Sequence, residues 1–206
     1  MVLFSKRRNG TLAESENGYF GNKRFEGMLR FEKRIGIVTS EDRKVKTEIA
    51  EAFDRKSEIK ELFTEYTKML VDGDSKFKEY LDIQNYDEEI EHLEKKYGPP
   101  GGRLYIAYVD SQPAGCIGLR RINDESCEIK RLYVRPEFRR AGLGRLLVER
   151  IIRDAKTEGY RCILLDTLPF LESAMRLYKA YGFYEIESYN DSPLETSIFM
   201  RMDIVK

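Results

Sequence analysis

The 206-residue chain has one histidine, three cysteines and no net charge, and each scarcity narrows its chemistry. His92 lies in the charged stretch Tyr86–Tyr97, where a solvated helix is predicted. A Ser-His-Asp triad would therefore have to use His92 as its base, although His92 is predicted to lie at the surface. The cysteines Cys116, Cys127 and Cys162 are odd in number, widely spaced and without a CxxC pair. This pattern fits neither a disulfide framework nor a zinc ligand set, and it predicts a reducing, cytoplasmic compartment.

The balance of charge and the lack of a long apolar run argue against two kinds of partner. The 36 basic residues are matched by 36 acidic ones, so no net field attracts nucleic acid or an anionic membrane. A nucleic-acid role for the arginines between 131 and 145 would require steeply salt-dependent binding, and the rest of the chain supplies no basic face. No apolar run could span a bilayer, and no apolar segment follows the basic stretch Lys6–Arg8. We therefore expect no nucleic-acid partner and no membrane.

The chain divides into a polar extension and one domain. Residues 1–44 contain five glycines and show no sustained hydrophobic period, so they are predicted to be a poorly ordered or irregular extension, with a short strand at Ile35–Val38 left open. Residues 45–206 are long enough, and apolar enough, for a single domain with its own core.

Within the domain, hydrophobic periods and turn residues predict alternating strands and helices. Strands are predicted over 45–52, 103–109, 113–121, 126–134, 162–166, 183–186 and 197–202. Helices are predicted over 54–70, 87–97, 143–158 and 171–181, the first capped by Asp54 or Ser57. A strand, helix and strand between 126 and 166 call for a right-handed parallel crossover. The fold class is therefore a mixed α+β sheet with an antiparallel first half.

The segment from Lys130 to Arg145 carries the strongest functional signal, because a strand runs through a basic, glycine-bearing turn into a helix. The first amides of a helix are free, and its positive dipole end attracts anions. Gly142 and Gly144 would let the backbone approach a diphosphate. Three arginines could add charge-assisted hydrogen bonds, namely Arg139, Arg140 and Arg145. A glycine turn with solvated arginines is the alternative.

Spacing narrows the nucleotide that this turn could bind. Leu147 stands at the third glycine position of GxGxxG, and no GxxxxGK[ST] is present. Neither a dinucleotide fingerprint nor a P-loop is therefore supported.

Three stretches in register resemble the GNAT acetyltransferase superfamily. Arg139–Gly144 reads RRAGLG and matches the [Q/R]xxGx[G/A] element of that superfamily. Leu132–Glu137 before it resembles the flanking strand, and Ala174–Phe183 after it resembles the family's "A…LY…GF" helix. Leu165–Pro169, followed by Tyr189, Asn190 and Pro193, resembles a bacterial branch whose acceptors are mostly unassigned. The resemblance covers about residues 45–206.

This resemblance implies a GNAT fold, acetyl-CoA as co-substrate and no metal. It places the thioester in a slot between Val134 and the strand 162–166, where the two parallel strands of the family splay apart. Main-chain groups would hold most of the donor. The implied cofactor-binding residues are Leu132, Tyr133, Val134, Arg139, Arg140, Ala141, Gly142, Leu143, Gly144, Arg145 and Ala174. Where many relatives carry an Asn for the pantetheine, this chain has Phe170 and Leu171.

Two side chains are candidates for proton transfer. An ordinary amine with a pKa of about 10.4 is neutral in only about one molecule in a few thousand at pH 7, so a base would help. Glu128 matches a position where related enzymes often carry a general base, acting directly or through water; a solvent-facing Glu is the alternative. Tyr178 aligns with the tyrosine that many GNAT enzymes place by the CoA sulfur, and plain core packing is its alternative.

The predicted function is acetyl transfer to a primary amine of a small molecule or peptide, directly in a ternary complex. The alternative is a GNAT-fold sensor that binds acyl-CoA without efficient turnover. An acetyl-cysteine intermediate on Cys127 or Cys162 is not favoured, because cysteines in apolar strands are usually inert and buried. Four aromatic residues could line an acceptor cleft or simply pack, namely Tyr133, Tyr184, Tyr189 and Phe199. Edge strands near the C-terminus leave room for a homodimer.

Overall fold

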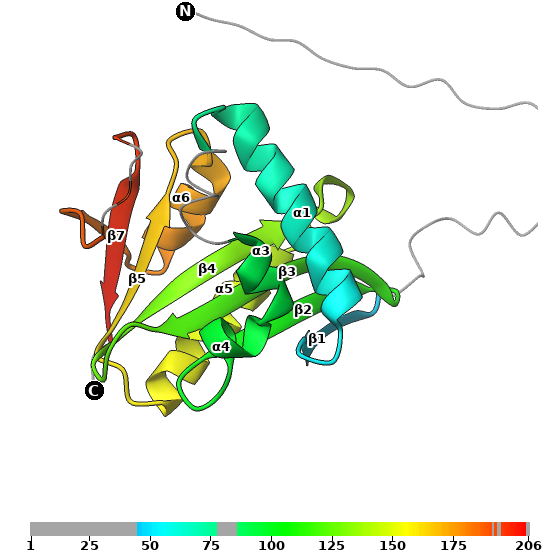
Figure 1. Cartoon of the computed structure of the whole chain (residues 1–206), viewed down its shortest axis with the longest axis horizontal. Helices are drawn as coiled ribbons and strands as arrows, with labels where there is room; N and C mark the ends of the chain where they lie inside the picture. The colour runs from blue at the N-terminus through cyan, green and yellow to red at the C-terminus, as the bar shows by residue number, and fades with distance from the viewer. Residues whose placement is uncertain (1–44, 78–85, 191, 193–194, 205–206) are drawn as a thin grey trace, which may run out of the picture. The chain divides into compact units, whose positions relative to one another are not determined.

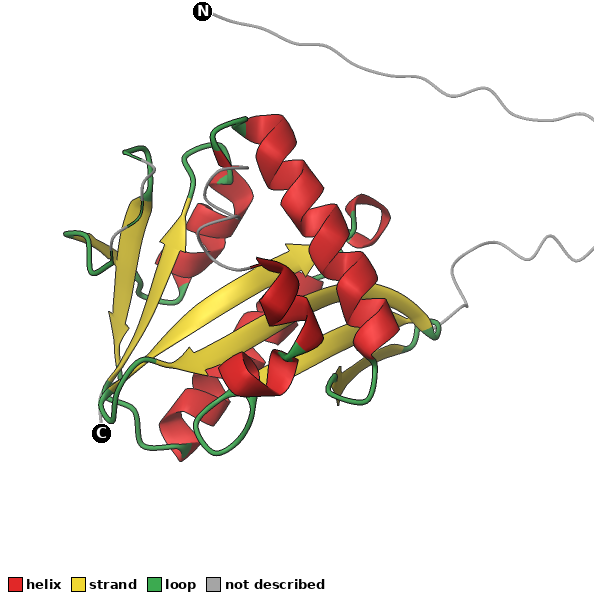
Figure 2. Cartoon of the chain, in the orientation of Figure 1, coloured by secondary structure: helices red, strands yellow, loops and turns green. Residues whose placement is uncertain are grey.

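A computed structural model describes residues 45–77, 86–190, 192 and 195–204. The predicted extension 1–44, with its open strand at Ile35–Val38, lies outside these residues, and so does Pro193. The described part of the chain forms a seven-stranded sheet in the order β1-β2-β3-β4-β5-β7-β6, with helices on both faces (Figure 2).

The elements follow the predicted order, with bounds close to those that the sequence indicates. The strands are β1 (Thr47–Glu51), β2 (Arg103–Val109), β3 (Gln112–Arg121), β4 (Ser126–Val134), β5 (Cys162–Thr167), β6 (Tyr184–Ile186) and β7 (Ile198–Asp203). The helices are α1 (Lys56–Gly73), α3 (Tyr86–Glu91), α4 (Leu93–Tyr97), the 3-10 turn η1 (Pro136–Phe138), α5 (Leu143–Thr157) and α6 (Glu172–Ala180).

The pairing of the strands confirms the predicted mixed α+β class. β4 and β5 are parallel and are joined through α5, whereas the pairs β1–β2, β2–β3, β3–β4, β5–β7 and β6–β7 are antiparallel. A strand-helix-strand unit of this kind packs back onto its sheet with a right-handed crossover. β1 and β6 form the two edges of the sheet.

Helices cover both faces of the first half of the sheet, which explains the nearly unbroken apolar run of β2. Leu104 and Ile106 belong to the core under α1 and α4, while Tyr105 and Ala107 belong to the core under α5. In Figure 1, α1, α3 and α4 lie in front of the sheet and α5 lies behind it. Strands that are buried on both faces lose the alternation of apolar and polar residues seen in half-exposed strands.

The predicted helix 87–97 is wrong in one respect, because it is broken at His92. The backbone of His92 has φ −125° and ψ 53°, outside the helical region, and separates α3 from α4. This charged segment has no continuous apolar stripe to stabilise one straight helix. Instead, the break lets Leu93 and Tyr97 enter the core, whereas His92 is exposed as predicted.

The predicted cap of α1 is also wrong. The N-cap residue is Arg55 rather than Asp54 or Ser57, and no side chain caps the helix. Arg55 instead donates a hydrogen bond from Nη1 to the Tyr108 hydroxyl at 3.0 Å. A contact to β2 therefore fixes the start of this helix in place of a local cap.

Candidate active site between two parallel strands

The sheet splits in its middle, between β4 and β5. Their parallel pairing ends at Glu128 opposite Leu164. Beyond this point β4 stays paired with β3 as far as Val134, while β5 stays paired with β7 as far as Thr167. The two strands fan apart in Figure 1, as the family resemblance predicts.

A β-bulge in β4 accompanies the split. Cys116 of β3 lies opposite Tyr133, and Gly118 lies opposite Lys130, so β4 carries one extra residue between these pairs. Arg131 lies within the bulge at φ 58°, a left-handed conformation that costs a non-glycine residue roughly 1–2 kcal/mol. A bulge bends its strand and increases the local twist, and this one turns the end of β4 away from β5.

A buried ion pair holds Arg131 in this conformation. Its Nε and Nη2 atoms donate to the two carboxylate oxygens of Glu89 on α3, at 2.8 and 2.9 Å. The two side chains are only 5% and 2% exposed, and the guanidinium lies 5.5 Å from the Phe63 ring centre and 5.3 Å from that of Tyr86. Arg131 and Glu89 are 42 positions apart, and no sequence pattern links them.

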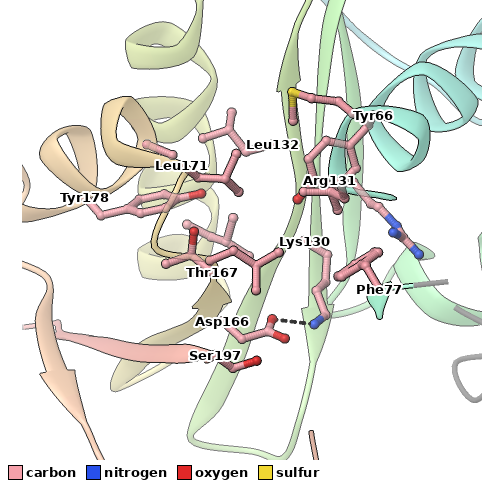
Figure 3. Close-up of a pocket in the computed structure, with 15 residues that line it drawn as sticks. Tyr66, Phe77, Lys130, Arg131, Leu132, Asp166, Thr167, Leu171, Tyr178 and Ser197 are labelled. Carbon is pink, nitrogen blue, oxygen red and sulfur yellow. Dashed lines mark hydrogen bonds and ion pairs between the residues drawn. The ribbon is translucent and has the colours of Figure 1, made fainter. Parts of the chain in front are cut away.

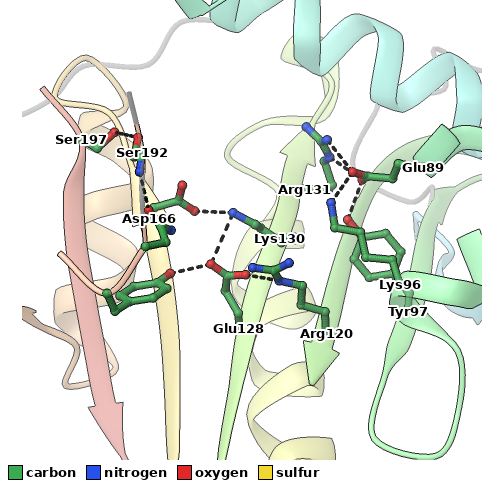
Figure 4. A network of polar contacts seen from close by, with 12 residues as sticks. Glu89, Lys96, Tyr97, Arg120, Glu128, Lys130, Arg131, Asp166, Ser192 and Ser197 are labelled. Atoms are coloured by element: carbon green, nitrogen blue, oxygen red, sulfur yellow. Dashed lines mark hydrogen bonds and ion pairs between the residues drawn. The ribbon is translucent and has the colours of Figure 1, made fainter. Parts of the chain in front are cut away.

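The charges around Glu89 keep it ionised despite its burial. Burial alone would raise the pKa of Glu89, but the guanidinium of Arg131 and the ammonium of Lys96 outweigh it and lower the pKa to about 2. Tyr97 donates a further hydrogen bond to Glu89 Oε1 at 2.7 Å. Figure 4 shows these groups converging on the carboxylate. The bulge is therefore anchored by the ionised carboxylate of Glu89, which accepts several hydrogen bonds.

A pocket fills the split. Its lining comes from α1, β4, β5, α6 and the segments next to them, and consists of Tyr66, Met69, Leu70, Phe77, Ile129, Lys130, Arg131, Leu132, Asp166, Thr167, Leu168, Leu171, Ala174, Tyr178 and Ser197. Figure 3 shows side chains of β4 and β5 facing each other across the opening. Three residues of the predicted site, Leu132, Ala174 and Tyr178, are thus brought together.

Tyr178 is the predicted acid, and its hydroxyl points into the split (Figure 3). The side chain is 5% exposed, and its ring also packs against Phe183 at 5.6 Å. Burial, followed by the neighbouring Tyr66 and the carboxylate of Asp166, raises the pKa of Tyr178 well above its usual value. Tyr178 therefore stays protonated across the physiological range, as a proton donor must.

At the base of the pocket lies a group of ionised and polar side chains that we call the charged cluster. It consists of Arg120, Glu128, Lys130 and Asp166 (Figure 4), together with Tyr189, which is bonded to Glu128. Glu128 is fully buried. Its Oε1 accepts from the Tyr189 hydroxyl at 2.6 Å and lies 3.3 Å from Lys130 Nζ, and its Oε2 accepts from Arg120. The solvent-facing alternative for Glu128 is therefore wrong. The pocket lining contains Lys130 and Asp166 rather than Glu128.

The loop between β4 and α5 has the predicted features of an anion site. Gly142 is the N-cap of α5 at φ 79°, where glycine avoids the steric cost, and no side chain caps the helix. The first helical bond runs from Leu146 N to Gly142 O at 3.1 Å. Within the described part of the chain, the amides from Arg140 to Arg145 have no backbone acceptor. Free amides at a helix N-terminus suit a diphosphate.

The three predicted arginines differ in their geometry. Arg140 and Arg145 are exposed at the loop, and Arg145 Nε lies 2.9 Å from Glu149. Arg139 turns back, and its Nε donates to the carbonyl of Val134 at 3.1 Å. Arg139 therefore braces the end of β4, and the other two remain beside the free amides.

The remaining predicted residues separate into main-chain and packing roles. Tyr133 and Leu143 bury their side chains in the core, so only their main chains could serve a ligand, whereas Ala141 is exposed in the loop. Leu171 lines the pocket, and Phe170 is exposed.

The aromatic candidates for an acceptor cleft do not gather at one place. Tyr184 lies on the edge strand β6, where its hydroxyl donates to Asp203 at 2.7 Å. Tyr189 and Phe199 form an edge-to-face pair at 5.4 Å beside the charged cluster. Tyr133 packs beneath α1, at 5.9 Å from Tyr66. Tyr66 lines the pocket, so Tyr133 also lies close to the split.

The cysteines are free and buried, as expected for small hydrophobic residues. Burial raises the pKa of Cys116 to about 12, and it also raises the pKa of Cys127. Both thiols are therefore poor nucleophiles, which argues against an acetyl-cysteine intermediate on Cys127.

Comparison with known proteins decides the family. Residues 58–183 match the model of the acetyltransferase (GNAT) family. The chain belongs to the GNAT family. An uncharacterized N-acetyltransferase of Dictyostelium discoideum is 32% identical, over 76% of this chain and 98% of its own length. Another of Schizosaccharomyces pombe is 41% identical, over 61% of this chain and 78% of its own length. The chain is accordingly an acetyl-CoA-dependent N-acetyltransferase.

Solved GNAT structures share the fold. An acetyltransferase from Streptococcus agalactiae superposes with a TM-score of 0.63 at 23% identity, covering 77% of this chain and 98% of that one. An N-acetyltransferase from Thermoplasma acidophilum, solved with coenzyme A, gives 0.62 at 19% identity and covers 77% and 99%. The predicted placement in a bacterial branch is not confirmed, because the two sequence relatives above are eukaryotic.

None of the helices in the described ranges is long and apolar enough to cross a membrane. Among the same residues, no three His, Cys, Asp or Glu side chains are grouped so that they could hold a metal ion.

Proposed function

We propose that the protein moves the acetyl group of acetyl-CoA to a primary amine of a small molecule or peptide, directly and in a ternary complex at the split between β4 and β5. The observation that carries the proposal is the end of β4–β5 pairing at Glu128 and Leu164. Beyond this point the two strands separate around a pocket that has Tyr178 on one wall and Lys130 and Asp166 at its base.

The donor site is proposed to be mostly main chain. The backbone of Leu132, Tyr133 and Val134 follows the bulge directly and would hold the acetyl and pantetheine portion. The free amides from Arg140 to Arg145 would hold the diphosphate, with the exposed guanidinium groups of Arg140 and Arg145 adding charge. When bound, acetyl-CoA supplies a thioester whose carbonyl carbon is open to attack by an amine.

Proton transfer is assigned to Tyr178 and Glu128. The amine nitrogen forms the new C–N bond as the C–S bond breaks, and the sulfur takes a proton from the Tyr178 hydroxyl. The ammonium nitrogen loses one proton before it attacks and a second as the amide forms. Both protons leave through water toward Glu128, which lies 3.3 Å from the lining residue Lys130. Solvent takes both protons from Glu128 and returns one to Tyr178. One proton is released for each ammonium ion acetylated.

Glu128→Gln tests the base. Since the glutamine cannot accept the proton, we expect kcat for CoA thiol release to fall roughly 10²-fold at pH 7. The defect should shrink as the pH rises toward the pKa of the acceptor amine, because the neutral amine no longer needs a base. Glu125→Gln is the control, since Glu125 lies three residues earlier, in the bend before β4, and forms an exposed ion pair with Arg161. A defect that stays constant with pH would show that Glu128 only supports the structure.

The alternative, a sensor that binds acyl-CoA without turnover, predicts a different result. Such a protein would bind acetyl-CoA yet release no CoA thiol with any amine. Thiol release that depends on an added amine would therefore support the acetyltransferase and contradict the sensor hypothesis.

A further inference from the structure

An ion pair bridges the split at the base of the pocket. Lys130 extends from β4 and Asp166 from β5, and their Nζ and Oδ1 atoms lie 2.6 Å apart (Figure 3). Both side chains line the pocket, although they are only 11% and 12% exposed. These residues come from the two strands that separate to form the site, so any acceptor that reaches the base of the pocket meets them.

The pocket combines this charged base with an apolar wall. The lining includes aliphatic and aromatic side chains from α1, from the segments that follow α1 and β5, and from the residue before α6: Met69, Leu70, Phe77, Leu168 and Leu171. A ligand that fills the pocket therefore presents polar atoms at one end and a hydrocarbon group at the other.

We propose that Asp166 and Lys130 select the acceptor, and that this acceptor is an α-amino acid with an apolar side chain. The inference rests on the proposed function. The amino group binds the carboxylate of Asp166, and the carboxylate of the ligand binds the ammonium of Lys130. The side chain lies against Met69, Leu70 and Phe77.

Charge balance favours an acceptor with both groups over a simple amine. The charged cluster contains two cations, Arg120 and Lys130, and two anions, Glu128 and Asp166, so its formal charges cancel. A simple ammonium ion would add one uncompensated positive charge to a nearly buried site, which is costly. A zwitterion adds no net charge. Its ammonium group takes the place of Lys130 beside Asp166, and its carboxylate takes the place of Asp166 beside Lys130.

The geometry also brings the amine to the reaction. Lys130 is two residues from Leu132, where the proposed donor backbone begins, and Asp166 and Tyr178 line the same pocket. The carboxylate of Asp166 is close enough to Tyr178 to contribute to its raised pKa. An amine bound at Asp166 therefore lies in the cavity that holds the proposed acid and the proposed thioester site.

Matched acceptors test the proposal. CoA thiol release is measured with L-leucine against 3-methylbutylamine and with L-phenylalanine against 2-phenylethylamine, pairs that differ only in the carboxylate. We expect kcat/KM of wild type to be at least about 10-fold higher for each amino acid, since only the amino acid makes a charge-assisted hydrogen bond to Lys130. Lys130→Met should lose this preference while its Kd for acetyl-CoA stays unchanged. Lys179→Met, an exposed lysine on α6, is the control.

Each other outcome counts against the proposal. Simple amines that react as well as the amino acids in wild type would overturn it, whether or not Lys130→Met folds. An equal loss of both series in Lys130→Met would show that Lys130 only supports the structure. Acetyl-CoA binding with no turnover of either series would overturn this acceptor class and leave the donor site standing. Failure to bind acetyl-CoA would overturn the proposed function itself.

Discussion

Replacing Glu89 with glutamine is expected to lower the free energy of unfolding by about 3–5 kcal/mol, because it removes one partner of a buried ion pair. The substitution leaves the Arg131 guanidinium charged and about 5% exposed at the bulge of β4. It also frees Arg131 from the contact that offsets its positive φ. Denaturant unfolding of wild type and variant measures the difference.

The neighbouring Glu88 provides a matched control. Glu88 lies on the same helix and forms an ion pair with Lys95 at 3.1 Å, but its side chain is 58% exposed. Glu88→Gln should cost no more than about 1 kcal/mol, since exposed ion pairs are screened by solvent. Adding Arg131→Met to Glu89→Gln should recover part of the loss, because it removes the unpaired charge. A Glu89→Gln variant as stable as the Glu88→Gln variant would contradict this account.

The contribution of Glu89 should also depend on pH. Its pKa is lowered from 4.5 to about 2 in the folded protein, so the stabilisation is complete above about pH 4.5 and is lost as the pH falls toward 2. A difference of this size corresponds to about 3 kcal/mol. The gap in stability between wild type and Glu89→Gln should therefore narrow below pH 4.5 and remain constant above it.

Tyr178→Phe is expected to lower kcat for CoA thiol release roughly 10²-fold to 10³-fold, with little change in the Kd of acetyl-CoA. The hydroxyl is the only group removed, and it faces the split, while the ring contact with Phe183 is kept. Without this proton donor, the thiolate must leave unprotonated. Stopped-flow or steady-state thiol release measures kcat, and calorimetry measures the Kd.

Tyr184→Phe serves as the control for Tyr178→Phe. It removes a hydroxyl that donates to Asp203 on the exposed edge of the sheet. Its kcat should match that of wild type. If Tyr178→Phe also keeps the kcat of wild type, Tyr178 is a packing residue and another group must protonate the sulfur.

The sequence predicts the elements that have strong local patterns. Local signals include the apolar face of α5 and the glycine before it, which has φ 79°. The turn residues that separate β2 from β3 and β3 from β4 are local signals as well. The split of the sheet is predicted from the family resemblance. The family motif includes the end of β4 and the loop after it, and the two parallel strands of the family separate at that point. The free amides of the loop follow from the position of Gly142 before a helix.

The ion pairs of the site could not be predicted, because the two partners of each pair are distant in sequence. Glu89 lies in a run of charged residues that is typical of a solvated helix, yet it is buried against Arg131. Lys130 and Asp166 meet only because two strands from opposite ends of the crossover lie beside each other. The bulge could not be predicted either, since nothing in the sequence indicates that Arg131 adopts a positive φ. Burial and pairing of charges depend on tertiary contacts, which local pattern does not encode.

Calorimetry of acetyl-CoA binding to wild type, Gly142→Glu and Gly159→Glu tests the central claim most directly. Both glycines flank α5 at positive φ, 79° and 84°, and neither has an atom within 4 Å of an added Cβ, so the two variants carry similar backbone strain. Only Gly142 lies at the free amides. The account predicts micromolar binding by wild type and by Gly159→Glu, and no binding by a folded Gly142→Glu. Equal binding by all three proteins, or none by wild type, would contradict a donor site at this helix N-terminus.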